Sequence, residues 1–360
     1  MSYIVRRVFS GLLIVFALTW VTFALFWLLP AEPWRAILTE ANPTAAQIKA
    51  TNHKLGVDRP VVAQYGKFVW GIARHGSFGR DYYGQSVNDS LKRKLPITWA
   101  IVFGGAVLLF LLAIPLATLS ALRANTALDR AILLVCIAGV ALHPFIIGTG
   151  LRDLFASKLH WLPGYYYCPL RGSVEISRLD PTTFDYNTQT CGGVGAWASH
   201  LALPWFTFAI IFLPLYVRML RGSIVEVLEQ PYVLTARAKG VGRQRLLRSH
   251  VLRNAMLQPL TMIGMEIGLA LTVAIYIETM FSLHGAGQLA IGTLGYGTGI
   301  ATGGGEIAGT QGGGFNLPVL AGVMFMIALT VIVLSLIVDL AYAYLDPRIR
   351  LSGRAAEASA

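Results

Sequence analysis

The chain has 360 residues, of which 55% are apolar and only 13% are charged, and its formal net charge is +11. A soluble globular domain carries roughly 25% charged residues, so this composition excludes an ordinary soluble protein and is typical of one that lies in a bilayer. A basic chain can bind nucleic acid, but the sequence contains no nucleic-acid-binding module. We attribute the positive charge to membrane topology and lipid contact.

Six apolar segments predict membrane-spanning helices, because a helix of about 20 apolar residues crosses the hydrocarbon core. They comprise residues 8–29, 97–119, 131–151, 201–217, 256–281 and 317–338. The fourth is short and contains two prolines, and the fifth contains Glu266 and Glu278, so these two assignments rest partly on their neighbours. The predicted fold is an all-α membrane protein with one transmembrane domain at 1–350 and a disordered tail at 351–360.

Arg6 and Arg7 precede the first span, an arrangement that signal peptides and membrane anchors share. The apolar run is longer than that of a usual signal peptide, and no small-residue cleavage pattern follows it, so we expect an anchor that is retained. In the next segment, 30–95, helical patterns at 45–55 and 61–72 predict two short helices outside the membrane.

Two polar residues inside spans are candidates for lining a solute path. His143 stands before Pro144 in the third span, where proline kinks the helix, and the alternative is that this pair is purely structural. Glu266 lies between Gly264 and Gly268, whose spacing allows close helix approach. An ionisable group at membrane depth is a functional candidate because its burial is costly, and the alternative is that Glu266 only packs a neighbouring helix.

Two of the three cysteines, Cys168 and Cys191, lie together in the polar segment 152–200. An oxidising exterior permits a disulfide there, and closing a loop of about 20 residues would contribute roughly 3 kcal/mol by the chain-entropy account. The alternative is two free thiols. No His or carboxylate shows zinc-ligand spacing with them, so we predict no metal site. Cys136, in the third span, is expected to be a packing residue.

The segment between the fourth and fifth spans, 218–255, contains the most informative motif of the chain. Its run Tyr-Val-Leu-Thr-Ala-Arg-Ala-Lys-Gly predicts a short helix that the glycine ends at little steric cost. The small side chains of Ala236 and Ala238 would let this helix seat closely in a groove of another protein. The predicted docking residues are Tyr232, Val233, Thr235, Ala236, Arg237, Ala238, Lys239 and Gly240.

The distribution of Lys and Arg predicts the orientation, because short cytoplasmic loops hold the excess. Segment 218–255 contains eight of them, both termini contain more, and segment 282–316 contains none. Both termini and 218–255 are therefore expected to face the cytoplasm. Segment 30–95 contains ten, but long loops cross the membrane largely regardless of charge.

Catalytic motifs are missing from the sequence. It contains no G-x-x-x-x-G-K-[ST] phosphate loop, no H-E-x-x-H and no G-x-S-x-G. The glycine-rich tract 292–314 lacks the Lys and the strand-to-helix context that phosphate binding needs, so we interpret it as a flexible outside loop. We predict a transport subunit that has no cofactor and does not hydrolyse ATP by itself.

Short motifs along nearly the whole chain resemble the permease subunits of ATP-binding-cassette importers, in the dipeptide, oligopeptide and nickel permease family. Each fragment is weak alone, whereas their order and spacing together are specific. They include Tyr3-Ile-Val-Arg-Arg7, Leu55-Gly-Val-Asp58, Gly76-Ser-Phe-Gly79, Trp161-Leu-Pro163, Tyr232 to Gly240 with Leu252-Arg-Asn-Ala255, and Leu345-Asp-Pro-Arg-Ile349.

The resemblance implies a type I importer permease with six membrane helices in the inner membrane. Such a subunit pairs with a second, homologous permease, and two cytoplasmic ATPases bind the coupling loops while an extracytoplasmic binding protein delivers the substrate. The segment matching Tyr232 to Gly240 is the family's coupling helix, although Leu234 stands where many members have Arg. Peptides are the leading substrate class, with nickel chelates and other small solutes behind.

A different class, an ATPase-independent channel or an ion-coupled secondary transporter, would also contain six spans. Such proteins usually place several ionisable groups or unwound elements at mid-membrane, often in repeated halves. The sequence shows no repeat between its halves and few charges at depth. A membrane scaffold would leave the docking motif unexplained.

Overall fold

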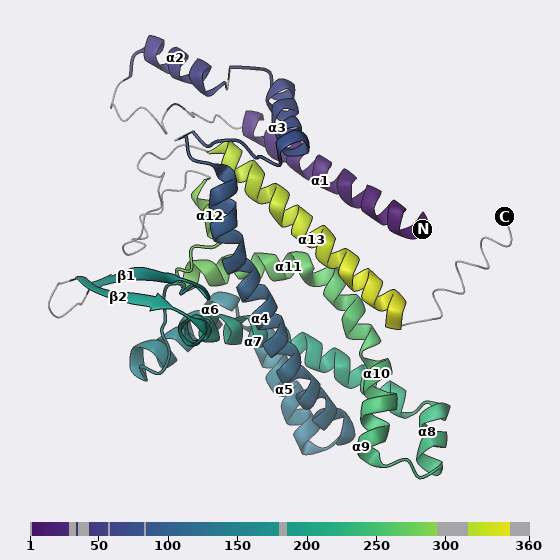
Figure 1. Cartoon of the computed structure of the whole chain (residues 1–360). Helices are drawn as coiled ribbons and strands as arrows, with labels where there is room; N and C mark the ends of the chain where they lie inside the picture. Colours follow the sequence, from purple (N-terminus) through teal and green to yellow (C-terminus); the bar gives the residue numbers. More distant parts are fainter. Residues whose placement is uncertain are drawn as a thin grey trace. The chain divides into compact units, whose positions relative to one another are not determined.

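The computed structural model describes residues 2–28, 34, 43–56, 58–82, 84–179, 186–293 and 316–345. Within these ranges the chain is almost entirely helical and has one two-stranded antiparallel sheet (Figure 1). The all-α membrane fold is thereby confirmed for the described part. The tail 351–360 and nearly all of the glycine-rich tract lie outside the described residues, so the predictions for both stay predictions.

The longer helices are α1 Ser2–Leu28, α2 Ala45–Leu55, α3 Val61–His75, α4 Val87–Leu122, α5 Ala127–Ala141, α6 Pro144–Arg152, α7 Val194–Leu228, α8 Pro231–Ala238, α11 Leu257–Met280 and α13 Leu317–Leu345. The shorter ones are α9 Arg243–Leu246, α10 Leu252–Ala255 and α12 Ala286–Gly292, with wider turns at η2 Asp153–Lys158 and η3 Leu247–Val251. The strands are β1 Ser173–Leu179 and β2 Tyr186–Gly192.

The chain divides into two compact units, and neither is continuous in sequence. One unit comprises Met1–Trp99, Tyr165–His200 and Phe281–Thr330, and the other comprises Ala100–Gly164, Leu201–Met280 and Val331–Ala360. Helices α4, α7 and α13 contribute residues to both units. The two units are defined by contacts in space. The single transmembrane domain expected at 1–350 was a prediction about the sequence, and it stays a prediction.

Every predicted span coincides with a helix or a bent pair of helices. Four helical stretches among the described residues are long and apolar enough to cross a membrane: Val87–Leu122, Val194–Leu228, Arg243–Met280 and Leu317–Val338. The pair Ala127–Val140 and Pro144–Lys158 forms a fifth if it counts as one span. For α1 the structure describes the side chains of the apolar stretch Phe9–Ala24 alone, so the sixth span, 8–29, stays a prediction.

The break in the third predicted span is sharper than a kink. Helix α5 ends at Ala141, and α6 begins at Pro144 after a bend of 101°. Proline suits the first position of a helix because its missing N–H would have no intrahelical partner there. His143 is the N-cap of α6, and its Nδ1 accepts a hydrogen bond of 3.2 Å from the backbone N–H of Phe145. This supports the structural interpretation of the His143-Pro144 pair.

The two short helices expected in 30–95 are confirmed as α2 and α3. Thr44 and Gln47 form a capping box at the start of α2, which satisfies backbone donors that a helix N-terminus leaves free. Both helices end at a glycine with positive φ, Gly56 at 72° and Gly76 at 57°. A left-handed residue ends a helix most cheaply when it has no Cβ.

In the second unit, glycines on α4 allow close packing against α7. A Cβ on Gly104 would overlap the ring of Trp205, and one on Gly105 would lie 2.6 Å from Phe208. The indole N–H of Trp205 donates a 2.8 Å hydrogen bond to the carbonyl of Ala100. Small residues at a helix interface bring backbones together, so this contact fixes α7 against α4 within the unit.

Candidate functional site

The predicted docking helix is present as α8, and its ends agree with the sequence pattern. Pro231 occupies its first turn, and Lys239 follows its last residue. Gly240 adopts φ 79°, and its N–H donates to Arg237 O at 3.0 Å while Val241 N–H donates to Ala236 O at 3.2 Å. These two bonds form a Schellman motif, which satisfies carbonyls at the helix end and requires a left-handed residue. Gly240 as the terminator is therefore confirmed.

Helix α8 is held firmly by the segments beside it. The side chain of Val233 is 1% exposed, so it anchors the helix. The amide of Asn254, in α10, donates a 2.6 Å hydrogen bond to the hydroxyl of Tyr232. Ser223, near the end of α7, donates a 3.0 Å bond to the carbonyl of Ala255, which ties α10 to α7. A force applied to α8 therefore reaches two longer helices, α7 and α11, through packed and hydrogen-bonded contacts.

The exposed face of α8 contains apolar, polar and basic side chains. Tyr232 and Leu234 are 43% and 52% exposed, which is high for large apolar side chains. Ala236 is only partly exposed and faces the same side as Val233, so of the two alanines expected at the docking face Ala238 alone is fully exposed. The exposed side chains along α8, and that of Lys239 after it, include Tyr232, Leu234, Thr235, Arg237, Ala238 and Lys239. This face, with those six residues, is called the docking face below.

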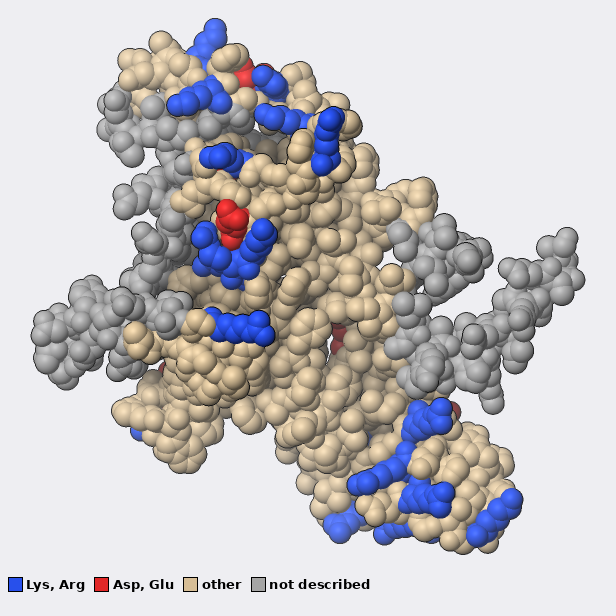
Figure 2. Space-filling view, viewed as in Figure 1, with Lys and Arg blue, Asp and Glu red and all other residues tan. Residues whose placement is uncertain are grey.

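Positive charge surrounds the docking face. Figure 2 shows Lys and Arg gathered over the region of α8 and α9, with little acidic colour on the visible side. The exposed basic residues there are Arg237, Lys239, Arg243, Arg245, Arg248 and Arg253. Such a surface attracts anionic lipid or an acidic protein partner and repels a basic one.

An ion pair that the sequence analysis missed lies at the end of α7 from which α8 follows. Arg221 binds Asp129, in the first turn of α5, through two hydrogen bonds of 2.6 Å. Ser120, at the end of α4, donates a further bond of 2.5 Å to the same carboxylate. Three helices of the second unit thus meet at one charge pair, in which the carboxylate of Asp129 is buried and Arg221 is partly buried.

The two candidates for a solute path have different neighbours. Glu266, in α11, is partly buried and interacts with the hydroxyl of Tyr216, in α7, while its Oε2 has no hydrogen-bond partner. A Cβ on Gly264 would lie 3.4 Å from Val338 of α13, whereas one on Gly268 would meet nothing within 4 Å. Both distances leave room for a Cβ, so within this chain neither glycine is needed for close helix approach. His143 lies with its ring 6.2 Å from that of Tyr276.

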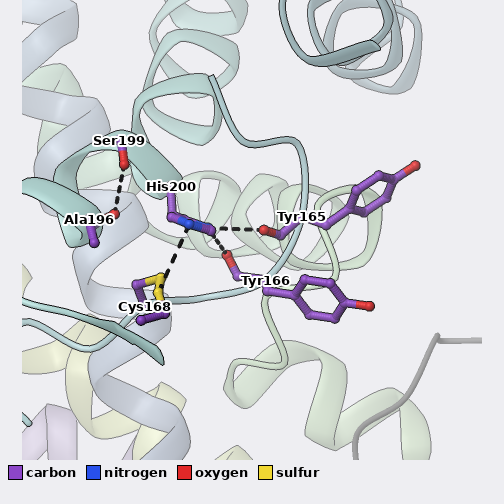
Figure 3. The surroundings of a disulfide bond; sticks show 7 residues. Tyr165, Tyr166, Cys168, Ala196, Ser199 and His200 are labelled. Carbon is purple, nitrogen blue, oxygen red and sulfur yellow. Dashed lines mark hydrogen bonds between the residues drawn. A yellow bond between two sulfur atoms is a disulfide. The ribbon is translucent and has the colours of Figure 1, made fainter. Parts of the chain in front are cut away.

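In the structure a disulfide joins Cys168 and Cys191 at the base of the hairpin formed by β1 and β2, with a Cα–Cα distance of 5.5 Å (Figure 3). His200, in α7, lies against it: Nε2 is 4.0 Å from the sulfur of Cys191, and Nδ1 is 3.0 Å from the carbonyls of Tyr165 and Tyr166. Nδ1 therefore carries the proton. His200 thus lies at metal-ligand distance from the two cysteines, which the sequence analysis did not expect. A cysteine binds zinc as a thiolate, so the disulfide form offers no zinc site.

Comparison with known proteins decides the family. Residues 113–351 match the family described as binding-protein-dependent transport system inner membrane component, and residues 1–101 match the family that describes the N-terminal part of such components. The chain belongs to this family. It is the membrane permease component of an importer, and membership places it in the inner membrane as a multi-pass protein that works with a binding protein and an ATPase.

Curated relatives cover the chain over nearly its whole length. A putative peptide permease protein of Brucella suis is 31% identical, over 98% of this chain and 100% of its own. The probable D,D-dipeptide transport system permease protein DdpB of Escherichia coli is 28% identical, over 98% of both chains. The dipeptide transport system permease protein DppB of Alkalihalophilus pseudofirmus is 28% identical, over 97% of this chain and 99% of its own.

Proposed function

We propose that this chain forms half of a translocation path for peptides or a similar small solute, paired with a second homologous permease. Two cytoplasmic ATPases supply the energy, and α8 is the coupling helix on which one of them docks. Both termini and the segment 218–255 face the cytoplasm, as the distribution of Lys and Arg predicts. The names of the curated relatives support peptides as the substrate class.

The observation that carries this proposal is the way α8 is held. It is a short helix with a defined end at Gly240, a buried anchor at Val233 and a hydrogen bond from α10 at Tyr232. A lever must be stiff, because motion of a docked partner is otherwise lost in fraying. The docking face is open, and the sequence has no nucleotide-binding loop of its own, so ATP hydrolysis belongs to the partner subunits.

In this mechanism the ATPases move α8 when they close on ATP. The motion passes through the Tyr232–Asn254 and Ser223–Ala255 hydrogen bonds to α7 and α11. Glu266 and His143 remain candidates for contact with the solute. Glu266 lies on α11, which this motion reaches, and His143 caps α6, which packs against α11. Family membership disfavours the channel and ion-coupled alternatives, which have no use for such a lever.

The substitution Ala238→Glu tests the proposal. It places a carboxylate on the docking face without changing any span, and burying an unpaired charge at a protein contact is strongly unfavourable. We expect loss of substrate uptake and loss of ATPase co-purification, with normal membrane insertion. Ala50→Glu makes the same change at an exposed position of α2 and is the matched control, which should retain both. Normal uptake and co-purification by Ala238→Glu would refute the assignment.

A further inference from the structure

Helix α3 is apolar around most of its circumference, although it follows the first span in a segment expected outside the membrane. Successive residues of an α-helix are rotated by about 100°, so its side chains fall into three arcs. The inner arc contains Val61, Tyr65, Phe68 and Ile72; the outer arc contains Val62, Val69, Trp70 and Ala73; and the polar arc contains Gln64, Lys67, Arg74 and His75. The two apolar arcs together cover more of the circumference than the polar arc.

The inner arc packs against the apolar part of α1. The Tyr65 ring is 5% exposed and lies edge-on to the rings of Phe16 and Phe23, at 5.5 and 5.3 Å. Its hydroxyl is 2.9 Å from Oγ1 of Thr19 and donates to the carbonyl of Phe16 at 3.1 Å. These partners belong to the predicted span 8–29. Helix α3 therefore lies beside the apolar part of α1 and not beyond its end (Figure 1).

The outer arc is open. Val62, Val69 and Trp70 are 68%, 37% and 62% exposed, which is costly in water for three large apolar side chains on one helix face. On α1 itself, Leu12 and Phe16 are 62% and 55% exposed, as expected of a helix whose surroundings are lipid. Because Tyr65 fixes α3 at the depth of Phe16, the surroundings of α1 are also the surroundings of the outer arc.

We propose that α3 is a membrane-interface helix whose outer arc, with the large side chains of Val62, Val69 and Trp70, is immersed in the lipid of the leaflet on that side. Its polar arc faces the headgroups and water. Such helices bury an apolar face about 5–10 Å into the boundary between headgroups and acyl chains.

The charged and aromatic residues of α3 fit this position. Arg74 places its guanidinium 5.7 Å from the centre of the Trp70 ring, at the edge between the outer and polar arcs. Tryptophan is enriched where hydrocarbon meets headgroups, and Lys and Arg extend their charged ends toward water and phosphate. Lys67 stands in the polar arc, nearly opposite Val69. Lipid phosphates would therefore suit the Lys67 side of α3, and acyl chains would suit the Val69 side.

Nitroxide labels at two neighbouring positions test the proposal. Val69→Cys and Lys67→Cys are made in a chain that also carries Cys136→Ala, and each is labelled in the full importer reconstituted in phosphatidylethanolamine and phosphatidylglycerol bilayers. Oxygen concentrates in acyl chains, whereas a neutral nickel chelate stays in water. We expect the label at 69 to collide more often with oxygen than with nickel, and the label at 67 to show the reverse order.

Two other results would overturn the proposal. If nickel dominates at both positions, the outer arc faces water. If the label at 69 is reached by neither reagent, a protein covers the arc. Repeating the measurement without the binding protein, and then with this chain alone, shows whether that cover is the binding protein or the second permease.

Discussion

Arg221 and Asp129 are 92 positions apart in sequence and form a bidentate ion pair, with Nε 2.6 Å from Oδ1 and Nη2 2.6 Å from Oδ2. The Asp129 side chain is only 2% exposed, and it accepts two more hydrogen bonds, from Ser120 and from the backbone of Asn125. Such a pair fixes geometry, because the buried carboxylate of Asp129 would be an uncompensated charge without Arg221. It fastens the end of α7, next to the docking helix, to α4 and α5.

Removal of one partner of this pair should be strongly destabilising. We expect Arg221→Ala to lower the free energy of unfolding by about 3–5 kcal/mol, because Asp129 then remains buried without its cation. Arg221→Lys keeps the charge but cannot bind both oxygens in a fixed fork, so a smaller loss is expected. Both losses should appear as a lower midpoint temperature in thermal unfolding of the purified importer, with the larger decrease for Arg221→Ala.

Arg218→Ala is the control for this series, since Arg218 is exposed on the same helix. It should unfold near the wild-type temperature. If Arg221→Ala unfolded at the same temperature as Arg218→Ala, the Arg221–Asp129 pair would not stabilise the protein as stated here.

Gly240 is required for its backbone conformation and not for space. Its φ is 79°, and an added Cβ would meet nothing within 4 Å. Gly240→Val should therefore strain the end of α8 by about 1–2 kcal/mol through the left-handed backbone alone, and uptake should fall. Gly240→Asn is the matched comparison, because asparagine tolerates this conformation. Equal uptake by the two variants in transport assays would show that the left-handed terminator is unimportant.

The elements that could be predicted are those whose cause is local. Apolar runs marked the positions of the helices, and Gly240 marked a helix end, because both depend on neighbouring residues only. The Arg221–Asp129 pair and the contact of His200 with Cys191 depend on segments that meet only after folding. The partly buried position of Ala236 was missed for a similar reason: which side of α8 faces inward is set by its packing.

The β1–β2 hairpin was also missed, although β2 contains alternating Thr190 and Thr188 and its register places Val174 opposite Cys191. The sequence analysis treated 152–200 only as a polar segment outside the spans and predicted no strand in it. The 101° break at Pro144 exceeded the kink that a proline inside a continuous helix produces, because His143 caps a new helix there.

The Cys168–Cys191 disulfide should be present in freshly isolated protein. We expect non-reduced digests analysed by mass spectrometry to contain the two cysteine peptides joined, and Cys136, which is buried, to be recovered as a free thiol. Recovery of Cys168 and Cys191 as separate alkylated peptides would remove the disulfide and reopen His200 and the two thiolates as metal ligands.

The orientation can be read from two exposed positions. In a Cys136→Ala chain, a membrane-impermeant maleimide should label Arg59→Cys in intact cells, and Arg245→Cys, which lies outside the docking face, only after the inner membrane is permeabilised. This order follows from the excess of Lys and Arg in 218–255. The reverse order of labelling would invert the proposed topology.

The central claim, that α8 docks on an ATPase, is tested most directly by cross-linking from the docking face. A photoactivatable amino acid at position 238, in cells that contain the whole importer, should form a covalent product with the ATPase subunit, and the same group at position 50 should not. The yield at position 238 should change when ATP is trapped in the ATPases, because the lever moves with them. A product with lipid or with no protein at position 238, in an importer that still transports, would contradict the account.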